Sequence, residues 1–442
     1  MATILAEVAE ALQIVFTSTA NAAADRTGFV QRTSKLTGAA FVQALTFGWL
    51  ANPQATLEEL AQAAGTVGVS LSPQALEQRF TPQAAACLLE VLQAAVARVL
   101  TAEPVAIPIL QRFPGGFTVL DSTTIALPEA FASLWPGCAG ATSAAGGRSS
   151  LKLQVRWDLL HGSLHGPFVH AGRSSDRRSP LALAPLPQGT FHLADGSYFR
   201  VARLQQLSDE GVFWLSRLLP RTSLYVDERP AQTISGLLAN APTDMVDLPV
   251  RMGKERRIAC RLVAVRVSPD VAAQRRQRLQ HTIRRRHRQT HPDCWTFTEW
   301  TVYVTNMSAT LLPVPEALVL ARCRWQIELL FKLWKTYGRI DESRSAQPWR
   351  VLCEIYAKLL GMVVQHWILL VCCWSYPDRS LAKASATVRR HALNLAAVIA
   401  QRHLVAKNLE ILQRCLQRGC RVNRRVQKPS TFQLLLDLTE GG

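Results

Sequence analysis

Apolar positions along this chain follow two different periods, and the change between them falls near residue 116. Before it, Ala40–Leu50 and Ala84–Leu100 carry apolar residues at helical spacing, so residues 1 to about 108 are predicted to be helical. After it come short runs rich in β-branched and aromatic residues, which predict strands. These runs are Phe117–Asp121, Leu151–Leu160, Pro167–Ala171, Phe191–Asp195, Phe213–Leu219, Ile258–Val267 and Trp300–Thr305. From about residue 315 to near 428 the helical period returns.

Two short helices around a glycine-containing turn are predicted within the N-terminal region. Thr56 and Glu59 have the spacing of a capping box, and Ser72-Pro73 opens a second helix that we expect to extend through Phe80. This pattern fits a helix-turn-helix that contacts DNA, although a purely structural helical hairpin gives the same signs. Cations just upstream favour DNA contact: Arg26, Arg32 and Lys35.

The most apolar window, Tyr356–Trp374, approaches the length of a membrane span. Lys358, Gln365 and His366 interrupt it, and no second window accompanies it, so a buried core helix is expected and no membrane association. The first 16 residues contain glutamates and no basic leader, which predicts no secretion signal. Ten dispersed cysteines without a CxxC pair suit reduced thiols in the cytoplasm.

The net charge of the chain indicates a polyanionic partner. Fifty Lys and Arg against 32 Asp and Glu give a formal charge of +18, which favours nucleic acid. The densest block, Arg275–Arg288, is predicted either to clamp DNA phosphates, chiefly through Arg284, Arg285 and Arg286, or to form a solvated loop.

The same region holds part of a zinc-like pattern. His287, His291 and Cys294 have suitable residue types, but a second pair of ligands is missing, so no structural zinc is expected.

One acidic residue among cations stands out in the C-terminal half. Arg324, Glu328, Lys332 and Lys335 fall within an arc of roughly 80° on a helix that turns about 100° per residue. This face is predicted to bind a charged ligand or, alternatively, to be a solvated face with ion pairs. The apolar residues around it are expected to anchor the helix in a core: Trp325, Leu329 and Leu333.

Two aspartates end predicted strands, where a polar turn opens toward solvent. Asp121 precedes Ser122-Thr123, and Asp195 precedes Gly196-Ser197. Carboxylates held by separate rigid elements suit a pair of Mg²⁺ ions in phosphodiester chemistry, and Glu328 would be the third. Taken singly, an aspartate after a strand is more often an ordinary turn residue.

The three motifs FTVLDSTT, LADGSYF and RCRWQIELLFKLWK, in this order, resemble those of DDE transposases of the IS-four family of bacterial insertion sequences. The family's third-acid helix reads Tyr, two residues, Arg, three residues, Glu, six residues, Lys. Arg324, Glu328 and Lys335 fit this signature, whereas Ala321 occupies the tyrosine position.

The resemblance implies an α/β fold with an RNase H-like mixed sheet flanked by helices. It also implies a β-rich insertion among the 132 residues from 196 to 327. Asp121, Asp195 and Glu328 would be the catalytic residues and the ligands of two Mg²⁺ ions, for which Mn²⁺ can substitute. Arg324, Lys332 and Lys335 would hold DNA phosphates. By similarity, Trp300 is expected to stack on a flipped base, or else to lie in the core.

Five segments follow from these expectations: an N-terminal helical DNA-binding region (1–108), the first part of the core (109–208), a mainly β insertion with the basic segment (209–312), the core completion with the catalytic helix (313–376) and a C-terminal helical region suited to dimerisation (377–442).

The activity implied by the resemblance is metal-dependent cut-and-paste transposition, with strand cleavage by water, strand transfer by a 3′-hydroxyl and a hairpin intermediate. The partners would be double-stranded DNA of terminal inverted repeats and target, and a second copy of the chain in a synaptic homodimer at the bacterial nucleoid. The alternatives are an inactive relative that acts as a DNA-binding repressor or inhibitor, and a structure-selective nuclease.

Overall fold

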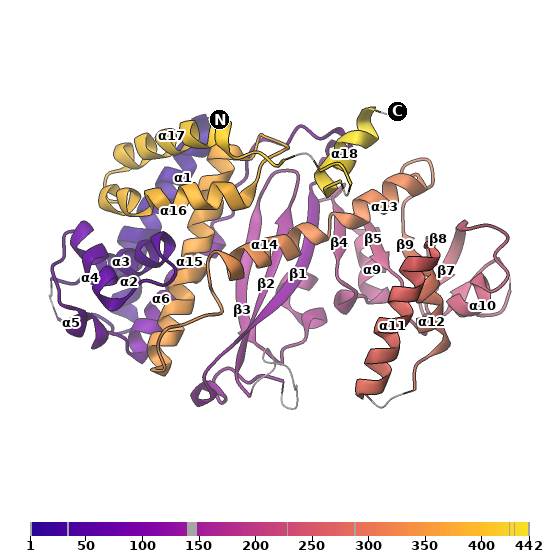
Figure 1. The fold of residues 1–442 in the computed structure, drawn as a ribbon, viewed down its shortest axis with the longest axis horizontal. Coiled ribbons are helices and arrows are strands. Elements are labelled where there is room, and N and C mark those ends of the chain that lie inside the picture. The colour runs from indigo at the N-terminus through magenta and orange to yellow at the C-terminus, as the bar shows by residue number, and fades with distance from the viewer. Residues whose placement is uncertain are drawn as a thin grey trace. The chain divides into compact units, whose positions relative to one another are not determined.

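The computed structural model describes residues 2–32, 35–138, 148–227, 229–286, 289–423, 425–427 and 429–440 (Figure 1). They form two compact units. The first unit comprises Met1–Gln111, Asp121–Ser174 and Gln326–Gln433, and the second comprises Arg112–Leu120, Ser175–Trp325 and Leu434–Gly442.

Helices dominate the first unit. They are α1 (Ala2–Ile14), the π-helical turn Val15–Thr19, α2 (Ala20–Arg26), α3 (Gly38–Ala51), α4 (Leu57–Thr66), α5 (Pro73–Glu77), α6 (Pro82–Ala97), α7 (Pro108–Gln111), α14 (Trp325–Thr336), α15 (Pro348–Cys373), α16 (Leu381–Val398) and α17 (Arg402–Gly419). Two strands, β2 (Ser150–Asp158) and β3 (Leu164–Ala171), pair antiparallel in this unit.

Helix α15 is the centre of the first unit. Every residue from Val351 to Cys373 is buried, and α1, α3, α6, α16 and α17 pack against the helix. Among the described residues, α15 alone is long and apolar enough to cross a membrane, and its apolar window is fully buried inside the fold. The expectation of a core helix is therefore confirmed.

The N-terminal helix pair is partly as predicted. Thr56 and Glu59 form the capping box at the start of α4, and Ser72 caps α5. However, α5 ends at Glu77 and not at Phe80, because its chain turns at Gln78 and Arg79 so that the Phe80 side chain can enter the core. A helix of five residues is much shorter than expected for a recognition helix.

Strands prevail in the second unit. They are β4 (Phe191–Ala194), β5 (Phe213–Arg217), β6 (Leu224–Tyr225), β7 (Met245–Met252), β8 (Ile258–Arg266) and β9 (Trp300–Thr305). The helices of this unit are α8 (Pro180–Leu183), α9 (Val201–Asp209), α10 (Ile234–Leu238), α11 (Pro269–Arg286), α12 (Pro292–Glu299) and α13 (Val314–Arg322). The last helix, α18 (Thr431–Glu440), spans the boundary between the units in the sequence.

One mixed sheet joins these strands in the order β3-β2-β1-β4-β5-β9-β8-β7-β6, where β1 is Phe117–Ala126. Strands β1, β4 and β5 are parallel, and β9, β8, β7 and β6 continue the sheet antiparallel. The predicted RNase H-like mixed sheet flanked by helices and the β-rich insertion are confirmed by this topology. The division into five segments stays a prediction.

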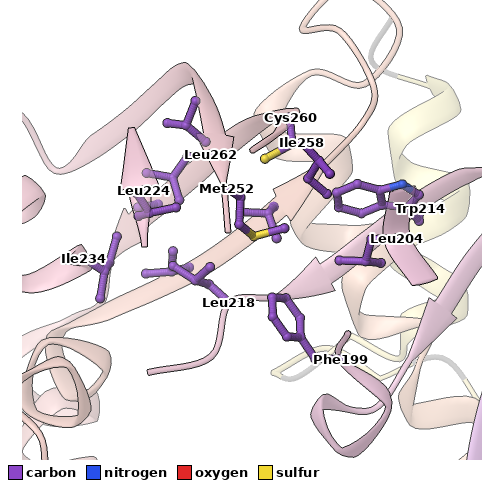
Figure 2. Packing of buried hydrophobic residues seen from close by; sticks show 14 of the residues in the cluster. Phe199, Leu204, Trp214, Leu218, Leu224, Ile234, Met252, Ile258, Cys260 and Leu262 are labelled. Atoms are coloured by element: carbon purple, nitrogen blue, oxygen red, sulfur yellow. The ribbon is translucent and has the colours of Figure 1, made fainter. Parts of the chain in front are cut away.

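The insertion has its own hydrophobic core (Figure 2). Side chains from β5, β7 and β8, including Trp214, Met252 and Leu262, meet there. Strand β7 is absent from the sequence prediction because Pro249 interrupts its apolar pattern. The proline is tolerated because β6 pairs only with Arg251 and Met252, so Pro249 lies on an edge stretch where a missing N–H costs no ladder bond.

The basic block does not form the solvated loop that was one of its two predicted alternatives. Residues up to Arg286 belong to α11, which begins at Pro269. No glycine or proline interrupts the helix after Pro269, and arginine and glutamine are good helix formers, so the charged segment continues as a helix.

Candidate active site

Asp121 lies inside β1 and not at its end. The strand is buried from Phe117 to Leu120, and its side chains become half-buried from Asp121 to Thr124. The expectation that the strand ends at the aspartate is wrong, because the β-branched residues of Thr123-Thr124-Ile125 favour the extended conformation. Asp121 Oδ1 accepts a hydrogen bond from the Ser122 backbone N–H at 2.8 Å.

Asp195 follows β4 directly, as predicted. It caps the short 3₁₀ turn Gly196–Tyr198, because its Oδ2 accepts from the Ser197 N–H at 3.1 Å. Arg177 Nε donates to the Ser197 carbonyl at 2.7 Å and so holds the other side of this turn. The Asp195 side chain remains 43% exposed, so its carboxylate is fixed by the turn and open to a ligand.

A small cavity of about 30 Å³ adjoins Asp195 in the second unit. Its lining includes Arg177, His192, Tyr198 and Arg203. This volume suits a water molecule and is too small for a nucleotide, so any DNA would have to lie outside it.

Glu328 lies in the first turn of α14. The unpaired N–H groups of a helix N-terminus give this end a partial positive charge, which stabilises an anionic side chain. Arg324 precedes the helix, because Cys323 and Arg324 form a turn between α13 and α14. The continuous helix predicted from Arg322 to Lys335 is therefore wrong at this turn.

Two of the three predicted anchors of α14 point away from the core. Trp325 and Leu329 are 55% and 54% exposed, whereas Leu333 is buried. The helix packs through a different set of residues: Ile327, Leu330, Phe331, Leu333 and Trp334. These residues form the wider apolar face, so they determine which side of the helix is buried.

Arg324 and Asp195 form an ion pair in the second unit. Arg324 Nη1 lies 3.7 Å from Asp195 Oδ1, and the guanidinium carbon lies 5.4 Å from the centre of the Trp325 ring. The structure thus brings together one residue of the second motif and one of the third.

Lys335 has a structural contact that the sequence did not indicate. Its Nζ donates to the Thr124 carbonyl of β1 at 2.9 Å, which ties α14 to the strand that carries Asp121. Lys332, one turn earlier, is exposed. Of these two lysines, the structure therefore shows Lys332 as the more accessible to DNA.

A buried ion pair secures the segment that follows α14. Lys358 Nζ lies 2.7 Å from Glu354 Oε1 on α15 and donates to the carbonyls of Arg339 and Glu342 at 2.9 and 2.8 Å. Ser343 Oγ donates to Glu354 Oε2 at 2.7 Å. We call Glu354, Lys358 and these three contact residues the α15 clasp; it fixes the chain that follows α14.

Three further residues of the second unit were not indicated by the sequence: Arg217, Arg275 and Tyr303. Arg217 on β5 pairs directly with Tyr303 on β9, and Arg275 Nη2 donates to Thr301 Oγ1 at 3.1 Å. Burial raises the pKa of Tyr303, while Arg217, Arg324 and Arg275 act in the opposite direction. The alternation of WTVYVT places Tyr303 opposite the apolar face, which is the signal that could have identified it.

Trp300 lies in the insertion core and is 2% exposed. The Arg266 guanidinium carbon lies 4.7 Å from the ring centre. Of the two roles that the sequence left open, this conformation shows the core role, because the ring offers no exposed face to a base.

Only part of the arginine run has side chains that the structure describes. Arg284 and Arg285 are exposed on α11, which fits phosphate binding, and Arg286 is described only as part of the helix backbone. His287 of the zinc-like pattern lies outside the described residues. Among the residues described, no group of three or more His, Cys, Asp or Glu side chains is arranged to hold a metal ion.

Comparison with known proteins shows the family of the chain. The family model of the transposase DDE domain matches residues 112–363, which is more than half of the chain. The chain belongs to the DDE transposase family. This transposase contains Asp121, Asp195 and Glu328 within the matched range.

Individual relatives are insertion-sequence transposases. The transposase for IS231F of Bacillus thuringiensis subsp. israelensis is 23% identical over 83% of this chain and 81% of its own length. The transposase for IS231C of Bacillus thuringiensis subsp. berliner is 23% identical over 92% and 90%. The transposase for IS1151 of Clostridium perfringens is 22% identical over 77% and 76%. The similarity thus covers most of the chain, including its helical N-terminal region.

Proposed function

We propose that this transposase moves an insertion sequence by a cut-and-paste reaction and that Asp121, Asp195 and Glu328 are its catalytic carboxylates. The observation that carries the proposal is the register of β1 and β4. Leu120 and Ala194 are partners on adjacent parallel strands, and each is followed directly by one of the aspartates.

Glu328 is related to Asp121 through the Lys335 contact. Lys335 is seven residues after Glu328, about 10.5 Å along a helix. Thr124, whose carbonyl accepts the hydrogen bond from Lys335 Nζ, is three residues after Asp121, about 10 Å along a strand. The helix that carries Glu328 and the strand that carries Asp121 are therefore joined at one contact, which supports joint action of the two carboxylates.

The donor set fits Mg²⁺, for which Mn²⁺ can substitute. All three groups are carboxylates with at least partial solvent access, and hard divalent cations prefer oxygen ligands. When bound, a pair of such ions would activate the attacking oxygen and neutralise charge on the leaving oxygen.

The protein's own residues position the DNA. Arg324 and Lys332 supply positive charge for the phosphates next to the cut, and the +18 charge of the chain raises the encounter rate with DNA. Water attacks phosphorus at the transposon end, the bond from phosphorus to the 3′-oxygen breaks, and the products are a 3′-hydroxyl and a 5′-phosphate.

The released 3′-hydroxyl then attacks phosphorus in the opposite strand, and the bond from that phosphorus to the 3′-oxygen of the flanking DNA breaks, which leaves a hairpin on the transposon end. Water then cleaves the hairpin phosphodiester and restores the 3′-hydroxyl. This hydroxyl attacks phosphorus in the target DNA and displaces a 3′-oxygen of the target strand. This route lets one set of carboxylates cut both strands. Joining two transposon ends requires at least two copies of the chain, so a synaptic homodimer is part of the proposal. The expected place of action is the nucleoid in the bacterial cytoplasm.

Cleavage of a duplex that carries the element's own terminal repeat tests the proposal. With Mg²⁺, the wild type is expected to nick and join the duplex to target DNA, whereas Asp195→Ala and Glu328→Gln are expected to lose both activities. Metal ions stabilise the transition state by several kcal/mol, so their loss is expected to lower the cleavage rate by more than about a hundredfold. Glu410→Gln, an exposed change on α17, is the control.

Three results would contradict the proposal. Undiminished nicking by Asp195→Ala would refute the site. Nicking without joined products by the wild type would favour a nuclease, and DNA binding without any cleavage would favour an inactive relative that acts as a repressor.

A further inference from the structure

Tyr303 and Arg217 share one face of the sheet in the second unit. They are direct partners in the antiparallel pair of β5 and β9, so their side chains project on the same side. Their neighbours Trp214, Val302 and Val304 belong to the insertion core on the opposite side. Tyr303 and Arg217 therefore face away from that core.

Asp195 extends this row across the sheet. Leu193 of β4 pairs with Leu215 of β5, so Asp195 and Arg217 each come two residues after a register pair. Arg324 completes the edge, because its Nη1 lies 3.7 Å from Asp195 Oδ1. The row thus consists of Asp195, the proposed catalytic carboxylate, followed by Arg217 and Tyr303.

Arg275 reaches the same face from α11. Its guanidinium donates to Thr301 Oγ1 at 3.1 Å and to the Trp300 carbonyl at 3.4 Å, and Thr301 lies two residues before Tyr303 on the same side of β9. Arg217 and Arg275 thus lie on the face that carries Tyr303, and Arg324 lies beside Asp195 in the same row. Because this face offers guanidinium donors and a hydroxyl donor, an anion with several acceptor oxygens is the chemically matched ligand. We call Arg217, Arg275, Tyr303 and Arg324 the Tyr303 cluster.

The cluster is open to such a ligand. Arg217 is exposed, and Arg275, Tyr303 and Arg324 are half-buried. Partial burial strengthens a charge-assisted hydrogen bond, since less water competes for it. A DNA backbone phosphate that lies beside Asp195 can reach this face.

We propose that the Tyr303 hydroxyl donates a hydrogen bond to a backbone phosphate of the transposon-end DNA, within the Tyr303 cluster. This role rests on the proposed function of Asp195. Tyr303 is thus a DNA-positioning residue from outside the three motifs.

Removing only the hydroxyl tests this role. Tyr303→Phe is expected to weaken binding of end DNA by roughly tenfold to a hundredfold, as for loss of a hydrogen bond to a charged group. The matched control is Tyr225→Phe on β6, whose ring lies under Arg257 in the same sheet. Binding is measured in EDTA by fluorescence anisotropy, so the result does not depend on cleavage.

A neutral backbone identifies the phosphate. A set of duplexes is used, each with a single methylphosphonate at a different position around the cut. At one position, the substitution is expected to lower the affinity of the wild type but to leave the already weaker affinity of Tyr303→Phe unchanged. An equal loss for both proteins at every position would overturn the assignment. Competition by inorganic phosphate equal to that by the duplex would indicate a free-anion site in place of a DNA contact and would also overturn it.

Different results would contradict the Tyr303 contact and the proposed function. If Asp195→Ala is inactive while Tyr303→Phe binds within twofold of the wild type, the Tyr303 role is wrong and the proposed function stands. If Asp195→Ala still nicks DNA, the proposed function fails, whereas the EDTA binding assay still reports the phosphate contact. Melting temperatures of Tyr303→Phe and Tyr225→Phe equal to that of the wild type exclude a folding defect.

Discussion

Arg324 Nη1 lies 3.7 Å from Asp195 Oδ1, which links the turn before α14 to the end of β4. A guanidinium at this distance partly neutralises the carboxylate and still keeps donors for a phosphate. Because Arg324 lies in a turn, its place depends on this ion pair and on the Trp325 ring more than on helix geometry.

Replacement of Arg324 should therefore affect DNA cleavage more than folding. Arg324→Gln is expected to lower the cleavage rate by about tenfold to a hundredfold, and Arg324→Lys to restore only part of it, because an ammonium lacks the planar fork of donors. Arg322→Gln, exposed at the end of α13, is the control. Equal rates for Arg324→Gln and Arg322→Gln in single-turnover cleavage would contradict this prediction.

The two lysines of α14 should separate stability from DNA affinity. Lys335→Met removes the bond to the Thr124 carbonyl and is expected to lower the free energy of unfolding by about 1 to 2 kcal/mol. Lys332→Met, at an exposed position, is expected to leave stability unchanged and to reduce the slope of log affinity against log salt by about 1. Urea unfolding and salt-dependent binding measure the two effects; a reversed pattern would show that Lys335 is the phosphate ligand.

Removing one charge of the ion pair in the α15 clasp should strongly lower the free energy of unfolding. Lys358→Met leaves Glu354 as an uncompensated buried charge and is expected to lower the free energy of unfolding by about 3 to 5 kcal/mol. Urea unfolding measures this loss. The double variant Glu354→Gln/Lys358→Met should be less destabilised than Lys358→Met alone, and additive losses would argue against the coupling.

His366 should make stability depend on pH. Burial lowers its pKa to about 4 from an ordinary 6.5, and its Nε2 lies 2.7 Å from the Gly162 carbonyl. The unfolded chain gains a proton below about pH 6.5 and the folded chain only near pH 4. The stability due to neutral His366 is therefore present above pH 6.5 and lost as pH falls to about 4.

Unfolding at several pH values measures this effect. Between pH 6.5 and 4, the free energy of unfolding should fall more steeply in the wild type than in His366→Gln, by up to about 1.4 kcal/mol per pH unit. His281→Gln, exposed on α11, should follow the wild type. Parallel curves for His366→Gln and the wild type would refute the assignment.

Local patterns predicted much of the fold. The alternation of Phe191–Asp195 and its Gly196-Ser197 turn is a short-range signal, and the structure shows the strand and the capped turn where it indicates them. The capping box of Thr56 and Glu59 is equally local. Such features depend on residues three or four positions apart, which the sequence displays directly.

Features that depend on distant partners were not predictable in the same way. Pro249 is compatible with β7 only because β6 is short, and Tyr303 has cationic neighbours only because β9 pairs with β5. The exposure of Trp325 and Leu329 similarly follows from which face of α14 meets the rest of its unit. Each outcome is set by packing between elements far apart in the chain.

The burial of α15 has a practical consequence for studies of DNA binding. Helices α3 and α6 from the N-terminal region pack directly on α15, so an isolated fragment of residues 1–108 would expose the apolar surfaces of both helices to water. Such surfaces promote aggregation. DNA binding by this transposase is therefore best dissected by point substitutions in the intact chain, because the N-terminal helices and α15 fold as partners.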